Sequence, residues 1–164
     1  MFKDQPWLNS LNSTQKKLLK QSFALLTLVK ESKQKFFDYS FLVVSAAKAY
    51  EGFLKDWLYQ NGFISRHDFQ EEYFRIGKAL NPELEHIKRF RKECLYQEIS
   101  EKFGEETAQF LWQTWKRCRN RLVHYFEREK QNFDLAEAEK RLEQIVEAIE
   151  KAYLSATPPK AWQV

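Results

Sequence analysis

Glycine and proline are scarce in this chain, which has 4 of each among its 164 residues. Because a turn-rich β fold uses both residues at its turns, their scarcity disfavours such a fold and favours long helices. Only 2 cysteines occur, Cys94 and Cys118, and their spacing matches no metal-ligand motif. Both lie in segments with a helical pattern, so we expect reduced thiols in the core.

Long apolar runs are also missing. No stretch of about 18 apolar residues occurs, so we expect no membrane span. Residues 1–6 lack the apolar run of a signal peptide. The sequence has no glycine-rich phosphate loop and no metal-ligand cluster, so we expect neither a cofactor nor a metal. Together these features predict a cytoplasmic protein.

Apolar and aromatic side chains are plentiful. Hydrophobic residues make up 43% of the chain and aromatic residues 16%, which is enough for a sizeable core in one domain of ordinary size. The net charge is +4 and the pI is about 9.0, a mildly basic balance that is compatible with a nucleic-acid partner. We expect one helical domain over residues 1–164, with an irregular arm at 1–11 and a loose tail at 157–164.

Apolar periodicity divides the chain into helical segments. The predicted ranges are 13–31, 39–61, a shorter helix at 69–80, a segment at 82–103 that a break could divide, 105–127 and 135–155. Asp38 is the predicted N-cap of the second helix, and Asn61-Gly62 is its stop signal. Asp134 and Glu137 have capping-box spacing at the start of the last helix. The predicted fold is all-α, an up-down bundle of four main helices and one shorter helix.

The densest functional chemistry lies at residues 116–126, where three arginines, a lysine and one of the 3 histidines fall within eleven residues. Asn120 and His124 are four residues apart and share a helical face. Arg119 lies about 140° around an ideal helix from His124, and its long side chain could swing back toward the ring. Such a cluster suits a phosphodiester, because arginine binds phosphate and histidine transfers protons near neutral pH.

Two further arginines belong to the same stretch. Arg117 and Arg121 precede His124 by seven and three residues and share its side of the helix. We expect both to support the site or to bind RNA. The alternative for the whole stretch is a solvated basic face, or a surface that binds anions without chemistry.

Glu51 is the second unusual feature. It occupies the position that completes an otherwise apolar stripe of the second helix, formed by Val44, Ala47, Leu54 and Leu58. Because burial of an unpaired charge costs several kcal/mol, we expect Glu51 to have a cationic or hydrogen-bonding partner, or to face a cleft. An ordinary buried ion pair would also satisfy this expectation.

These two stretches carry a family resemblance. Arg119-Asn120, with His124 four residues further on, resembles the Arg-x4-His motif of HEPN domains in its form with Asn after Arg. Residues 49–55 (AYEGFLK) resemble the corresponding helix of the HEPN ribonuclease domain in RNase LS-type toxins. In that family a glutamate on this helix joins the arginine and histidine in the active site, and the resemblance implies this role for Glu51.

The resemblance further implies a metal-independent endoribonuclease, the toxin of a toxin–antitoxin pair. The RNA 2′-hydroxyl would attack the adjacent phosphate, with His124 as general base or acid and Arg119 stabilising the developing charge. Glu51 would share the proton transfer or orient these two residues, and Asn120 would fix the helix or the ring. The implied partners are the RNA substrate, a second copy of the chain in a homodimer and a cognate antitoxin protein.

Two other interpretations stay open. One is a catalytically silent HEPN module that binds a nucleotide or a partner and works with a nucleotidyltransferase. In the relevant subgroup a tyrosine lies two residues after the histidine, whereas this chain has Phe126 there and Tyr125 one residue earlier. The other is a helical interaction protein whose arginines bind an acidic partner.

Overall fold

The structure, a computed structural model, describes residues 5–32, 34–84, 94–123 and 132–156. Helices account for all the regular secondary structure in these ranges, and no strand occurs in them, which confirms the predicted all-α bundle. None of the helices in these ranges is long and apolar enough to cross a membrane. The predicted tail at 157–164 and the first four residues of the arm lie outside the described residues.

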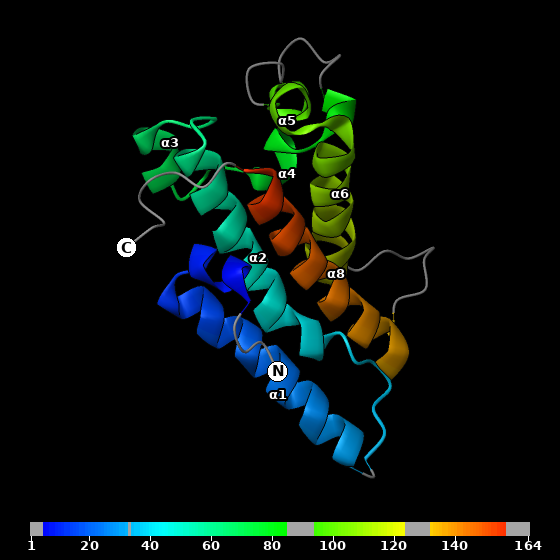
Figure 1. The fold of residues 1–164 in the computed structure, drawn as a ribbon. Helices are drawn as coiled ribbons and strands as arrows, with labels where there is room; N and C mark the ends of the chain where they lie inside the picture. The colour runs from blue at the N-terminus through cyan, green and yellow to red at the C-terminus, as the bar shows by residue number, and fades with distance from the viewer. Residues whose placement is uncertain (1–4, 33, 85–93, 124–131, 157–164) are drawn as a thin grey trace.

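Four helices form the body of the bundle. Helices α1 (Ser13–Glu31) and α2 (Phe41–Gln60) lie side by side, and α8 (Leu135–Ser155) contacts both α2 and α6 (Glu105–Trp115). In the order α1, α2, α6 and α8 these helices alternate in direction, as Figure 1 shows. All four contribute side chains to one hydrophobic cluster, so the bundle has a shared core.

N-terminal caps determine where the first and last long helices, α1 and α8, begin. The Asn12 side chain accepts hydrogen bonds from the backbone N–H groups of Thr14 and Gln15, each at 3.0 Å, and the Gln15 side chain accepts from Asn12 N at 2.9 Å. At α8, Asp134 accepts from the N–H of Glu137 at 2.8 Å. Because these signals lie within four residues of each helix start, the sequence predicted both starts correctly.

Helix α2 begins later than predicted. Ser40 is its N-cap, so the assignment of that role to Asp38 is wrong. The Asp38 carboxylate instead accepts from the N–H of Phe133 at 2.9 Å and from both the N–H and the hydroxyl of Ser40. Burial alone would raise the pKa of Asp38, but these hydrogen bonds outweigh it and hold the pKa below 3.8. Asp38 therefore ties the start of α2 to the segment that precedes α8.

The apolar face of α2 is wider than a single stripe. Its buried side chains are Leu42, Val43, Ala46, Ala47, Ala49, Tyr50, Phe53, Leu54, Trp57 and Leu58. Ala47, Leu54 and Leu58 of the predicted stripe are buried, whereas Val44 is 39% exposed, so the prediction that Val44 lies inside is wrong. Trp57 donates from Nε1 to the carbonyl of Ala152 at 3.2 Å, which fixes α2 against α8. Glu51 consequently lies at the edge of the buried face and not at its centre.

The middle of the chain departs most from prediction. In place of one helix at 69–80 the structure has α3 (Arg66–Gln70) and α4 (Ile76–Ala79), joined by residues 71–75. The segment at 82–103 has a break, as the sequence prediction allowed, because residues 94 and 95 are not helical. Within the described residues it contains only the 3-10 turn η2 (Pro82–Leu84) and helix α5 (Tyr96–Phe103).

The helix that carries the basic stretch changes its winding. Helix α6 passes into a π-helical turn, η3 (Lys116–Asn120), and then into α7 (Arg121–Val123). The N–H of Arg121 donates to the carbonyl of Lys116, five residues earlier, which is the π pattern. Angles based on an α-helical period therefore do not apply to Arg119. The predicted continuation to residue 127, His124 included, lies outside the described residues.

The N-terminal arm is more regular than predicted. Residues Pro6–Ser10 form the 3-10 turn η1 rather than an irregular segment. Trp7 and Leu11 are buried in the core cluster, with exposed fractions of 2% and 3%, so they anchor the arm to the body of the bundle.

Candidate functional site

A cleft of about 560 Å³ is lined by residues from α2, from the segment around α4 and from the junction of α6 with η3. Glu51 comes from α2, and Arg119 and Asn120 come from η3. Residues 72–78 supply the opposing lining, and Trp112 and Trp115 of α6 supply apolar surface. Three of the residues selected from the sequence therefore line one cavity.

Glu51 and Arg119 form a two-point ion pair within this cleft. Arg119 Nε lies 3.2 Å from Glu51 Oε2, and Nη2 lies 3.5 Å from Oε1. The guanidinium carbon also lies 5.1 Å from the centroid of the Trp115 ring, within cation–π range. The carboxylate therefore uses the Nε–Nη2 edge of the guanidinium and leaves the Nη1–Nη2 edge to bind an anion.

The exposure of this pair bears on its role. The Arg119 side chain is 33% exposed and that of Glu51 is 39% exposed. At such exposure solvent screens the attraction, and an ion pair typically stabilises a fold by about 0.2–1 kcal/mol. A structural ion pair in the core, the alternative considered for Glu51, would be dry, whereas this one opens onto a cleft. The geometry thus favours a site that ligands reach.

The residues that precede Glu51 and Arg119 in the sequence are buried and hold the backbone at both positions. Tyr50, which precedes Glu51, is fully buried and donates from its hydroxyl to the carbonyl of Leu111 at 3.0 Å. Cys118, which precedes Arg119, is also fully buried, and its thiol donates to Gln144 Oε1 at 3.7 Å. Because these neighbours are packed in the core, α2 and η3 present Glu51 and Arg119 from rigid backbone.

Burial also decides the chemistry of these two neighbours. It raises the pKa of the Cys118 thiol to about 12 and that of the Tyr50 hydroxyl well above its ordinary value. Both groups are therefore protonated at neutral pH. A thiolate nucleophile at Cys118 is excluded, and the prediction that Cys94 and Cys118 are free, buried thiols is confirmed.

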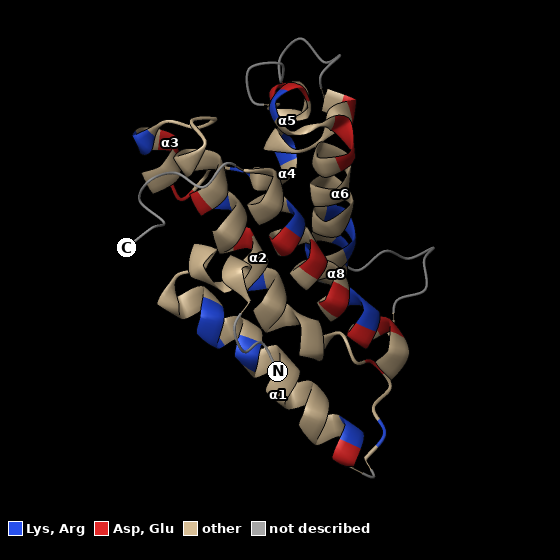
Figure 2. Ribbon diagram, viewed as in Figure 1, with Lys and Arg blue, Asp and Glu red and all other residues tan. Residues whose placement is uncertain are grey.

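The other basic residues have different surroundings. Lys116 Nζ lies 3.8 Å from Glu83 Oε1 and 5.8 Å from the Trp112 ring centroid. Arg117 and Arg121 are exposed and do not line the cleft. Figure 2 shows acidic and basic residues interspersed along α8, and basic residues where α6 passes into η3. Of the three arginines at residues 117–121, only Arg119 lines the cleft.

His124 lies outside the described residues, so its place relative to Glu51 and Arg119 stays a prediction. No family model, curated protein or solved structure matches the chain. The likeness to HEPN domains therefore rests on the residues that carry it: Glu51, Arg119, Asn120 and His124.

Sequence reasoning missed the lining opposite Glu51. Tyr73 and Arg75 lie between α3 and α4, in a stretch predicted to be continuous helix. Tyr73 is 81% exposed, which is unusual for a large aromatic side chain. No proline or glycine stands at residues 71–75 to mark the break, so local sequence gave no signal for this segment.

Proposed function

We propose that this protein is a metal-independent endoribonuclease and the toxin of a toxin–antitoxin pair. The observation that carries the proposal is the contact of Glu51 with Arg119 inside a solvent-accessible cleft. These residues come from helices far apart in the sequence, and the HEPN resemblance selects both of them. The histidine of the motif follows Arg119 by five residues.

The reaction would transfer a phosphoryl group within the RNA. The 2′-oxygen attacks the adjacent phosphorus, and its proton passes to a base. The bond from phosphorus to the 5′-oxygen breaks, and an acid protonates that oxygen. His124 would supply one of these proton transfers, while the free edge of Arg119 would stabilise the negative charge that develops on the phosphorane oxygens. The products would be a 2′,3′-cyclic phosphate and a 5′-hydroxyl.

The contacts of Glu51 support an orienting role over proton transfer. Both carboxylate oxygens face Arg119, at 3.2 and 3.5 Å. A carboxylate committed in this way holds the guanidinium at a fixed angle to the bound phosphate, and such preorganisation lowers the barrier more than a mobile cation would. Asn120 lines the same cleft and would position the η3 turn or the histidine ring.

A homodimer and an antitoxin complete the proposal. In HEPN-like ribonucleases the active cleft forms between two protomers, so we expect the two copies of His124 to face one groove. The cognate antitoxin would be a protein that closes this groove. Light scattering at tens of micromolar should show a dimer, whereas a fully active monomer would contradict a shared site.

Cleavage of single-stranded RNA in excess EDTA tests the function. The purified protein should cut the RNA, and analysis of the ends should find a 2′,3′-cyclic phosphate, or its hydrolysis product, and a 5′-hydroxyl. Arg119→Ala purified in the same way controls for a contaminating nuclease. A wild-type protein that binds nucleotide and leaves RNA intact would instead support the silent module that works with a nucleotidyltransferase.

A further inference from the structure

Residues Tyr73–Lys78, here called the α3–α4 ridge, separate two neighbouring clefts. The first is the cleft that holds Glu51 and Arg119. The second, of about 410 Å³, is lined on its other side by Phe63, Ile64, Asp68 and Leu95. Tyr73, Phe74, Arg75 and Lys78 line both clefts. A chain-like ligand that crosses the ridge would therefore contact the same side chains from either cleft.

Two side chains of the ridge are available to a ligand. Tyr73 is 81% exposed and makes no hydrogen bond or ring contact with another described residue. The Arg75 side chain is exposed and likewise forms no ion pair within the described part of the chain. An exposed aromatic ring and an exposed guanidinium that line the same clefts, neither with a partner in the described part of the chain, are a typical combination for a single-stranded nucleic acid, because the ring stacks on a base and the cation binds a phosphate.

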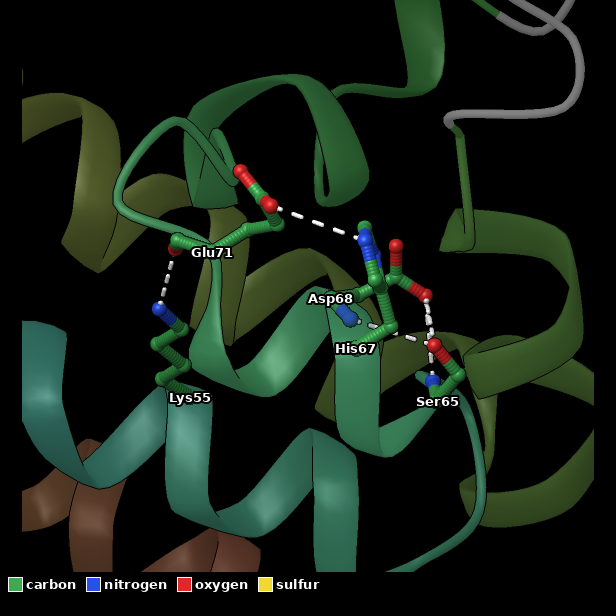
Figure 3. A network of polar contacts seen from close by, with 5 residues as sticks. All are labelled: Lys55, Ser65, His67, Asp68 and Glu71. Atoms are coloured by element: carbon green, nitrogen blue, oxygen red, sulfur yellow. Dashed lines mark hydrogen bonds and ion pairs between the residues drawn. The ribbon is translucent and has the colours of Figure 1, made fainter.

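The segment that precedes the ridge, from Ser65 to Glu71, is held in place by the contacts that Figure 3 shows. Lys55 of α2 donates from Nζ to the carbonyl of Glu71 at 2.7 Å. At the start of α3, Asp68 accepts from the N–H and hydroxyl of Ser65 at 3.1 and 2.6 Å, and these bonds lower the pKa of Asp68. Asp68 therefore stays ionised, and its hydrogen bonds with Ser65 fix the first turn of α3. Tyr73 thus projects from a segment anchored to α2.

We propose that the α3–α4 ridge binds single-stranded RNA and sets its path over the site, with Tyr73 stacking on an unpaired base and Arg75 binding a neighbouring phosphate. The proposal rests on the proposed ribonuclease function, because the Arg119 cleft would hold the phosphate that is cut. Stacking needs an unpaired base, so the ridge selects single strands over duplexes. It also selects by base size and stacking strength more than by hydrogen-bonded sequence readout.

The test measures binding separately from cleavage. A fluorescent single-stranded oligonucleotide made entirely of 2′-O-methyl RNA lacks the attacking hydroxyl and cannot be cut by the proposed reaction. Fluorescence anisotropy gives its affinity for the wild type and for Tyr73→Ala, Tyr73→Phe and Tyr73→Trp. Phe37→Ala is the matched control, because Phe37 is an aromatic residue of 85% exposure that lines neither cleft.

We expect Tyr73→Ala to weaken binding by about 5- to 150-fold, the range for the loss of one stacked base, while the Phe and Trp variants bind like the wild type. Phe37→Ala should bind normally, and a duplex of the same sequence should not respond to Tyr73→Ala. Arg75→Ala should reduce the salt dependence of binding by about one phosphate contact. Equal affinity of Tyr73→Ala and wild type would overturn the ridge proposal, as would equal losses for the Phe37 and Tyr73 variants.

The experiments distinguish a wrong ridge proposal from a wrong ribonuclease function. If the wild type cuts unmodified RNA and Tyr73→Ala binds the uncuttable strand as tightly as the wild type, the ridge proposal is wrong and the ribonuclease stands. If the wild type binds the strand through Tyr73 but never cuts RNA, the ridge proposal stands as a binding site and the ribonuclease is wrong.

Discussion

Gly77 packs against Trp115 so closely that a Cβ atom on Gly77 would lie 2.7 Å from the indole Nε1. Trp115 is only 5% exposed, and its ring also lies against the guanidinium of Arg119. The indole therefore has little room to move away, and any movement would reach Arg119. This contact connects the α4 side of the cleft to the arginine on η3.

Gly77→Ala should lower both stability and activity. Overpacking of a well-filled site costs about 1–3 kcal/mol, and each kcal/mol lowers the melting temperature by about 2–4 °C in a domain of this size. Gly52→Ala is the comparison, because its Cβ would meet the Gln15 side chain at 3.0 Å and could loosen the cap of α1, but would not touch Trp115. Thermal melts and RNA cleavage of both variants measure the effect. A Gly77→Ala protein with wild-type melting temperature and rate would contradict the account of this contact.

Asp38 should make stability depend on pH. Its folded pKa lies below its ordinary value of 3.8, so the stability it contributes is fully present above that value and is lost as the pH falls through the folded pKa. Asp38→Ala should cost about 1–2 kcal/mol near pH 7, because hydrogen bonds from Phe133 and Ser40 are lost. Urea titrations of both proteins at pH about 7 and about 3 measure this. If wild type and Asp38→Ala differ in their free energy of unfolding as much at pH about 3 as at pH about 7, the lowered pKa of Asp38 is contradicted.

Cys118 should be inert in the folded protein. Burial raises its pKa to about 12, so almost no thiolate exists at pH about 8. A thiol reagent such as iodoacetamide should leave Cys118 unmodified in the native state and alkylate it in urea, as mass spectrometry of the peptides would show. Rapid native labelling at Cys118 would mean that the η3 turn opens, against the packing described for it.

Parts of the fold were predictable because their signals are local. The starts of α1 and α8 follow from caps within a few residues, and the apolar face of α8 is narrow enough to show its period. In helix α2, 10 of the 20 residues are buried, so no single stripe defines its inner face. This is why Val44 was misplaced and why Glu51 lies at an edge. Its partner, Arg119, is a long-range contact that no local pattern specifies.

The π-helical turn and the α3–α4 ridge could not be read from sequence for a related reason. Residues 116–120 are ordinary helix formers, and the wide turn is visible only through the hydrogen bond from Arg121 to Lys116. The break at residues 71–75 lacks a glycine or proline. It is held instead by a hydrogen bond from Lys55, on helix α2, to the carbonyl of Glu71. Tertiary contacts, in both places, override the local preference for a straight helix.

Substitutions of the three arginines at residues 117–121 should affect RNA cleavage and RNA binding differently. Arg119→Ala should lower RNA cleavage by roughly 10²- to 10³-fold, the usual loss when a group that stabilises transition-state charge is removed. Arg117→Ala and Arg121→Ala should weaken RNA binding modestly and in a salt-dependent way, because both residues are exposed and outside the cleft lining. Cleavage rates of the three variants at two salt concentrations test this. An Arg121→Ala loss as large as that of Arg119→Ala would mean that the motif arginine is misassigned.

His124→Ala should abolish most cleavage, with a loss of roughly 10²- to 10⁴-fold. Because Glu51, Arg119 and His124 would act on one transition state, the double variant of Arg119 and His124 should lose far less than the product of the two single losses. Rates of the single and double variants form the test. Fully multiplicative losses would show that the two residues act independently and do not form one site.

The central claim is that Glu51 serves chemistry by holding Arg119, and RNA cleavage by Glu51→Gln beside its melting temperature tests it most directly. The isosteric change keeps the shape but removes the charge that orients the guanidinium. Misplacement of a catalytic group by about 1 Å costs about 10²-fold in rate, whereas loss of a partly exposed ion pair costs only about 0.2–1 kcal/mol. We therefore expect a rate about 10²-fold lower and a melting temperature within a few degrees of wild type. Wild-type cleavage by Glu51→Gln, with only its stability reduced, would show that the pair is structural and contradict the account.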